Sequence, residues 1–160
     1  MLLAQSQYEV MNERPNEKTF KGIISRKDLV TDTSFKWWKE GLAGYRPDPG
    51  AMAALQKYRD SLQFIVFMGT WCEDSHFVIP KFYYLIDISK FPEDHVSLIG
   101  VDRSKKTLSH LTEALGIINV PTIIVMKNGK EMGRVVEYGK SGLFDKDLGE
   151  IINSNGAATR

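Results

Sequence analysis

Three short apolar segments, separated by stretches of helical periodicity, dominate the chain after residue 63. The apolar segments span 64–68, 96–101 and 120–126. Short and nearly continuous apolar runs are typical of strands that are covered on both faces of a sheet. Apolar side chains recur at helical spacing within 70–90, after a short loop, and again within 108–115. This spacing predicts two helices between the strands.

A hairpin and a final helix are predicted after the third strand. Asn128 and Gly129 readily adopt the positive φ of a type I′ turn, so the third strand should pair with a strand at 134–138. A helix over 143–152 closes the pattern. The element order is then β-α-β-α-β-β-α, in which strands joined by helical crossovers should be parallel and the last pair antiparallel. The predicted fold class is α/β, with a mixed central β-sheet flanked by helices.

Helices are also predicted in the chain that precedes the first core strand. Residues 32–34 are N-cap types ahead of apolar residues at helical spacing over 35–42. Asp48 can cap a second helix, with a proline at its first position. Residues 1–30 are polar and weakly patterned, and one short edge strand is expected at 23–25.

Length and charge limit the classes of function. The chain has 160 residues, about one domain, with 21 basic and 20 acidic side chains and a formal net charge of +1. Without a field of one sign, no nucleic-acid partner is expected. No run approaches the ~18 apolar residues of a membrane span. A charged cluster at 102–106 predicts a solvated start of a helix.

The single cysteine is the most restrictive feature of the composition. One thiol cannot form an internal disulfide or supply a multi-thiolate metal site. His76, His95 and His110 are scattered without a ligand spacing. We therefore expect no metal and no cofactor.

Cys72 lies where a core strand ends and a helix begins. The unpaired amides and the positive dipole end of a helix N-terminus favour a thiolate over a thiol. A sulfur in this place is positioned for nucleophilic attack. The alternative is a small buried side chain without chemistry, which is common for free cysteine.

Two motifs around this cysteine resemble those of the thioredoxin superfamily. Trp71-Cys72-x-x-Ser75, with Pro80 five positions later, is similar to the active-site helix of that family, with serine in place of the second cysteine. Val120-Pro121-Thr122, followed by an apolar strand and Lys-Asn-Gly, resembles the cis-proline strand and its hairpin, and Gly139 matches a glycine in the closing turn.

This resemblance implies a fold and a domain organisation. A single thioredoxin-like domain would span residues 1–160, with its core at about 48–153. Residues at about 1–47 would form an N-terminal helical extension outside that core.

The resemblance also implies residue roles. Cys72 would be the nucleophile, and Trp71 would contribute to the partner-binding surface. Pro121 would be cis and would face the thiol. Val120 would offer its backbone N–H and C=O to an extended peptide, as in β-type recognition. The catalytic pair would be Cys72 and Ser75, whose hydroxyl could donate a hydrogen bond to the thiolate.

Departures from the family pattern change the expected chemistry. Ser75 has no sulfur, so it cannot attack the mixed disulfide through which exchange proceeds. Val66, six residues before the cysteine, stands where many thioredoxins place a buried acid. Glu73 and Asp74 add negative charge beside Cys72, which opposes ionisation of the thiol, although they suit the helix dipole.

His76, one turn after the cysteine, is a further possible modulator. As a cation it would favour the thiolate, and as a neutral imidazole it could act as a base. A solvated surface histidine is the alternative that we favour for it.

A monothiol thioredoxin-like protein is the leading functional hypothesis. Through Cys72 it would form mixed disulfides with partner proteins or with low-molecular-weight thiols such as glutathione, an activity of the thiol–disulfide oxidoreductase or isomerase type. The main alternative is a non-catalytic peptide-binding module that has lost redox function. A peroxide-reactive thiol is a weaker third hypothesis.

The N-terminus leaves the compartment open. Ala4-Gln5-Ser6 has the small-x-small form of a signal-peptide cleavage site, which favours export, for example to the periplasm. A frayed terminus of a cytoplasmic protein is the alternative.

Overall fold

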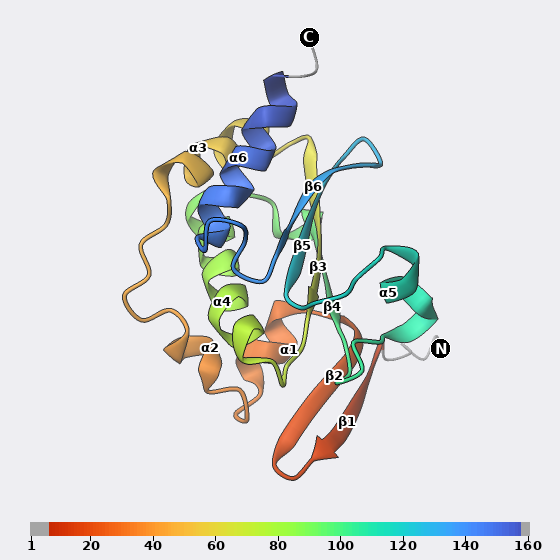
Figure 1. The fold of residues 1–160 in the computed structure, drawn as a ribbon. Helices are drawn as coiled ribbons and strands as arrows, with labels where there is room; N and C mark the ends of the chain where they lie inside the picture. The colour runs from red at the N-terminus through yellow and green to blue at the C-terminus, as the bar shows by residue number, and fades with distance from the viewer. Residues whose placement is uncertain (1–6, 158–160) are drawn as a thin grey trace, which may run out of the picture.

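The computed structural model describes residues 7–157, and in this part of the chain six strands form one mixed sheet (Figure 1). The order across the sheet is β1-β2-β4-β3-β5-β6. Strand β3 is parallel to β4, and the other neighbours are antiparallel. The bounds are Tyr8–Arg14 for β1, Glu17–Ile24 for β2, Leu62–Met68 for β3, Val96–Gly100 for β4, Thr122–Lys127 for β5 and Lys130–Val136 for β6.

Helices cover both faces of the sheet. In Figure 1, α3, α4 and α6 lie on one side and α5 lies on the other. The bounds are Arg26–Thr31 for α1, Trp37–Glu40 for α2, Pro49–Tyr58 for α3, Glu73–Ile88 for α4, Leu111–Ala114 for α5 and Phe144–Ala157 for α6. Short 3₁₀ turns span Glu93–His95 and Leu108–His110.

Two apolar cores follow from the two covered faces. The larger includes Phe64 of β3 and Phe82 of α4, both fully buried. The smaller includes Phe67 of β3 and Ile124 of β5, with Leu111 packed against it. Successive residues of β3 point to opposite faces, so one strand supplies side chains to both cores.

From β3 onward the chain has the predicted order β-α-β-α-β-β-α, and its arrangement is a thioredoxin-like fold. The predicted parallel direction holds for β3 and β4 but is wrong for the third strand. Strand β5 runs antiparallel to β3, with Val66 opposite Ile123. The physical reason is the short α5, which is too short to carry the chain back along the sheet. The chain therefore stays at the end where β3 and β4 finish, and β5 starts there and runs in the opposite direction.

The N-terminal extension is helical only in part. Strands β1 and β2 form a hairpin that the polar pattern did not predict, and the expected edge strand at 23–25 begins within β2. Most side chains of β1 are exposed, so no alternation of apolar residues reveals the strand. β2 joins the sheet by pairing with β4. The leader-like stub at residues 4–6 lies outside the described residues.

The helix expected at 35–42 is present but shorter, since α2 is a single turn, and the unpredicted α1 precedes it. Ser25 begins α1 through a capping box in which its Oγ accepts from the Asp28 amide, while the Asp28 carboxylate accepts from the Ser25 amide. Each of these bonds satisfies an amide that would otherwise lack a partner. Sequence reasoning did not weigh this capping box.

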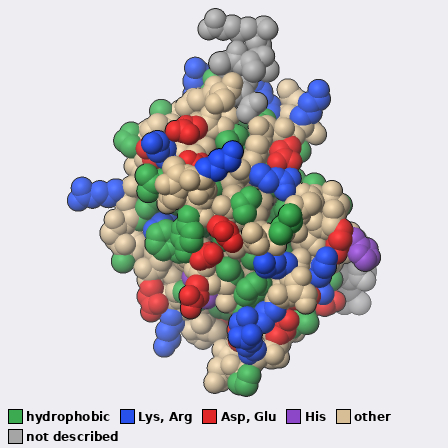
Figure 2. Space-filling view, viewed as in Figure 1, with side chains coloured by type: hydrophobic (Ala, Val, Ile, Leu, Met, Phe, Trp, Pro, Cys, Tyr) green, Lys and Arg blue, Asp and Glu red, His purple; other side chains and the backbone are tan. Residues whose placement is uncertain are grey.

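Other local signals are confirmed. Asp48 caps α3, its carboxylate accepting from the Ala51 amide at 2.9 Å. Asn128 and the glycine after it both have positive φ in the turn between β5 and β6. None of the helices among residues 7–157 has the length and apolar character of a membrane-spanning segment. Charges of both signs are interspersed over the face shown in Figure 2.

A buried lysine ties α2 to α4 near Pro80, which lies inside α4 without ending it. The Lys81 ammonium donates to the carbonyl oxygens of Gly41 at 2.6 Å and Phe77 at 2.9 Å, and it lies 3.4 Å from the centroid of the Phe77 ring. Burial lowers the pKa of Lys81. These contacts hold the chain after α2 against the helix that carries the cysteine.

Gly139 provides a test of the closing turn. Its φ is +81°, and a Cβ there would lie 2.2 Å from the Asp147 carboxylate. Gly139→Ala should lower the free energy of unfolding by more than the ~1 kcal/mol that a positive φ alone costs. Gly116→Ala is the matched control, since its φ is +64° and no atom lies within 4 Å of the added Cβ. Urea denaturation of both variants makes the comparison, and equal losses would contradict the proposed clash.

Candidate functional site

Cys72 lies at the N-cap of α4, four residues after the end of β3. Its backbone N–H donates to the Gly69 carbonyl at 3.0 Å, and its carbonyl accepts from the His76 amide at 2.9 Å. The thiol is half-buried. The first amides of a helix have no partner within the helix, and they favour negative charge at this end. The backbone therefore places the sulfur at the positive end of the helix dipole.

The cis peptide bond that precedes β5 lies against this sulfur. The bond between Val120 and Pro121 is cis. Cys72 Sγ lies 3.6 Å from the Val120 carbonyl oxygen, to which the thiol donates a weak hydrogen bond. Two segments separated by 48 residues thus meet at the thiol.

A hollow of about 300 Å³ opens at the sulfur and is lined by Trp71, Cys72, Glu73, Asp74 and Arg103. Trp71 forms one wall, and its indole Nε1 donates to the Val101 carbonyl at 2.9 Å. A Cβ at Gly69 would lie 2.6 Å from the indole, so only glycine leaves room for the ring here. The side chains of this hollow come from the end of the loop before α4, from the first turn of α4 and from the segment after β4.

The two acidic residues differ in their surroundings. Glu73 is exposed, whereas Asp74 accepts a hydrogen bond of 2.6 Å from the Tyr138 hydroxyl. This bond to a carboxylate raises the pKa of Tyr138 to about 12, with burial and the charge of Asp74 adding to the effect. Tyr138 also packs edge-on against Phe77. The first turn of α4 is thereby fixed to the chain after β6.

Ser75 is fully buried, and its hydroxyl oxygen accepts from the Gly69 amide at 3.1 Å. The expected hydrogen bond from Ser75 to Cys72 is not the one formed. The serine instead satisfies a buried amide at the end of β3, which would otherwise cost free energy. Val66 is likewise fully buried in the larger core.

His76 is not the solvated surface residue that we favoured. Its ring is stacked on Trp37 at 4.3 Å between centroids, and Nε2 lies 2.6 Å from the Thr70 carbonyl oxygen. A carbonyl only accepts, so Nε2 carries the proton of this bond. Burial lowers the pKa of His76, against the opposing effects of the Thr70 bond and of Glu73 and Glu17. The imidazole thus holds the loop before Cys72.

Arg103 and Glu17 were not predicted to belong to the site, and no role was predicted for Thr70. Thr70 is buried, and its hydroxyl accepts from the Phe20 amide and donates to the Lys18 carbonyl, both in β2. Arg103, from the cluster expected to be solvated, lies over the Trp71 ring and pairs with Glu17 of β2. Both side chains contact β2, so only the position of the hairpin β1–β2 identifies them as part of the site region.

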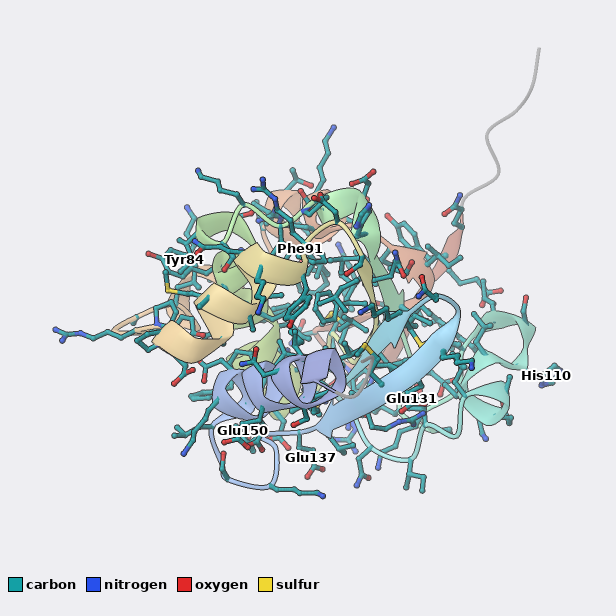
Figure 3. The ribbon with its side chains drawn as sticks, turned by 90° about the horizontal axis from the view of Figure 1, so that it is seen from above. Tyr84, Phe91, His110, Glu131, Glu137 and Glu150 are labelled. Atoms are coloured by element: carbon teal, nitrogen blue, oxygen red, sulfur yellow. The ribbon has the colours of Figure 1, made fainter. Side chains whose placement is uncertain are left out.

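A second, larger hollow of about 670 Å³ lies between β6 and α6, and no cysteine or histidine lines it. Glu137 and Glu150, two of its lining residues, lie on this side of the molecule in Figure 3. His110 lies at the opposite periphery. Among residues 7–157, no three His, Cys, Asp or Glu side chains are grouped to hold a metal ion. The sulfur chemistry therefore places the candidate site in the smaller hollow.

Comparison with known proteins supports the fold only. No protein-family model and no curated protein matches the chain. A crystal structure of a protein of unknown function from Pseudomonas aeruginosa is similar at a TM-score of 0.51 and 14% identity, covering 78% of this chain and 82% of that one. Oxidised thioredoxin O2 from Arabidopsis thaliana gives a TM-score of 0.42 and 23% identity, covering 64% and 83%.

The half-buried His76 predicts a pH dependence of stability. Because its folded pKa lies below the ordinary value of 6.5, the unfolded chain binds the proton more readily, and stability falls as pH drops through 6.5. His76→Gln keeps an N–H donor without titration, so its free energy of unfolding should fall less between pH 7.5 and 5.5. Urea denaturation of both proteins at both pH values measures this difference. The same loss in both would show that His76 does not titrate differently on folding.

Proposed function

We propose that the protein carries out thiol–disulfide exchange with a single thiol, and that Cys72 is its nucleophile. The observation that supports this most is the position of Sγ, at the N-terminus of α4 and 3.6 Å from the Val120 carbonyl oxygen. The thiol is half-buried and lies on an open hollow, so a partner disulfide can reach it.

Ionisation of the thiol would also prepare the binding of a partner. The neutral thiol donates its proton toward the Val120 carbonyl. A thiolate has no proton to donate, so the carbonyl oxygen becomes available to an N–H of an extended partner chain. Trp71 and Pro121 would lie under the same chain. Main-chain recognition of this kind gives affinity with little dependence on sequence.

The reaction can regenerate the Cys72 thiol only with a thiol from outside the chain. The Cys72 thiolate attacks one sulfur of the partner disulfide, whose S–S bond breaks, and the other sulfur leaves as a thiolate that takes up a proton. The product is a mixed disulfide between Cys72 and the partner. An external thiolate, such as that of glutathione, then attacks this bond, releases Cys72 as a thiolate and leaves in a new disulfide. Ser75 cannot perform this second step.

Covalent capture tests the proposal directly. Incubation with oxidised glutathione should add one glutathionyl group to the folded protein, read by intact mass, and Cys72→Ser should take up none. The rate of alkylation against pH then reports the thiolate fraction at Cys72. A thiol that reacts only after unfolding in urea would contradict the proposal. Peptide capture that survives Cys72→Ala would then favour the non-catalytic module.

A second thiol at position 75 should change the fate of the captured partner. In Ser75→Cys the new sulfur lies one helical turn from Cys72 and can expel the partner, so the mixed disulfide should shorten in lifetime and both thiols should be lost together. Ser89→Cys is the matched control, a buried serine at the far end of α4, about 24 Å along a helix of this length. Its adduct should persist. An equally stable adduct in Ser75→Cys would show that position 75 cannot reach the mixed disulfide.

A further inference from the structure

We propose that the N-terminal hairpin β1–β2 is a structural part of the thiol site, and that Glu17 is a positioning residue that holds Trp71 through Arg103. The positioning itself is independent of the proposed function, but its kinetic consequence rests on it. The hairpin lies outside the core implied by the resemblance, and its contacts with the site are specific side-chain contacts.

The first contact is a two-point ion pair. Arg103 Nε donates to Glu17 Oε1 at 2.6 Å, and Nη2 donates to Glu17 Oε2. The side chains retain only 28% and 19% of their exposure. The hydrogen bond from the guanidinium lowers the pKa of Glu17. The Arg103 amide also donates to the Glu13 carboxylate at 3.0 Å, so both strands of the hairpin hold this residue.

Arg103 in turn covers Trp71. Its guanidinium carbon lies 5.1 Å from the centroid of the indole, within the range of a cation–π contact. The indole N–H is bonded to the Val101 carbonyl, and Gly69 lies close to the ring. The Val101 carbonyl thus holds the edge of the indole, and the Arg103 guanidinium lies over its ring. The ion pair with Glu17 fixes the position of this guanidinium.

The second contact is through Thr70. The first residues of β2 lie outside its pairing with β4. The Thr70 hydroxyl accepts from the Phe20 amide and donates to the Lys18 carbonyl of this part of the strand. The loop that leads to Cys72 is therefore anchored to the hairpin at Thr70, while the wall of the hollow is anchored at Arg103. These contacts fix the geometry of the surface on which a partner chain would lie.

A partner that lies over Trp71 gains from this fixed geometry, because ordering a loose side chain on binding costs free energy. A small reagent that touches only the sulfur gains nothing from it. Loss of the ion pair should therefore slow the reaction with an extended disulfide-bonded peptide and leave a small alkylating agent unaffected. This difference separates positioning from a direct effect of the Arg103 charge on the sulfur.

Glu17→Gln tests the proposal, since it keeps the shape of the side chain and removes its charge. The probes are a disulfide-bonded peptide, iodoacetamide, and hydrogen exchange of the Trp71 indole N–H by NMR, assigned with Trp71→Phe. We expect the indole to exchange faster and the peptide rate constant to fall by about fivefold, the upper range for an ion pair near the surface. The rate with iodoacetamide should change by less than about twofold.

Two further variants sharpen the result. Arg103→Lys keeps the charge but lacks the two-point fork, so it should behave like Glu17→Gln. Glu131→Gln breaks a different arginine–glutamate pair, with Arg134 at 2.6 Å, and should leave all three readouts unchanged. Thermal unfolding checks that each variant is folded under the assay conditions.

Three outcomes would overturn the inference. These are unchanged indole exchange in Glu17→Gln, wild-type behaviour of Arg103→Lys, or an equal slowing of the peptide and iodoacetamide, which would assign the effect to charge at the sulfur. If wild-type Cys72 reacts with no disulfide at all, the proposed function fails. The indole exchange of Glu17→Gln would still decide whether the hairpin positions Trp71.

Discussion

Strand β3 is paired on both edges and buried on both faces, and its course constrains the rest of the structure. Its neighbours are β4 and β5, and its side chains enter both apolar cores. A strand held in this way ends at a fixed point, and the chain that leaves it must begin α4 nearby. The position of Cys72 is therefore set by the packing of the sheet and not by the flexibility of a surface loop.

The polar side chains near the sulfur form hydrogen bonds or ion pairs with other parts of the chain and not with the sulfur. Arg103 is paired with Glu17, Asp74 accepts from Tyr138, and His76 donates to Thr70. The first two pairs join segments that are distant in sequence, whereas the third lies within the loop before α4. These pairs therefore hold the segments in place around the N-terminus of α4.

The sequence predicted the parts of the fold that local patterns encode. The buried strands, the Asn128 turn and the Asp48 cap depend on residues that are close in the chain, and each is present. Strand β1 was missed because it is mostly exposed, and the direction of β5 was missed because it depends on how short α5 is. The pairing of β5 with β3 crosses a long separation in sequence, which leaves no periodic signal.

The sequence predicted the cysteine and the proline of the candidate site, but it did not predict the charged residues that hold Trp71. Trp71, Cys72, Val120 and Pro121 stand in short motifs, and the structure brings them together. Glu17 and Arg103 are 86 residues apart and are ordinary charged residues in the sequence. Their meeting depends on the hairpin, so only the folded structure identifies them.

The hydrogen bond between Ser75 and the Gly69 amide has a consequence for how this site could change. A hydroxyl oxygen is a good acceptor for a buried amide, whereas sulfur is a weak one. Ser75 therefore does more than lack a thiol, because it stabilises the end of β3 in a way that cysteine would not. A second thiol at position 75 would weaken this bond while both sulfurs are reduced. A change of Ser75 to cysteine would therefore lower the free energy of unfolding before it could add any second-thiol chemistry.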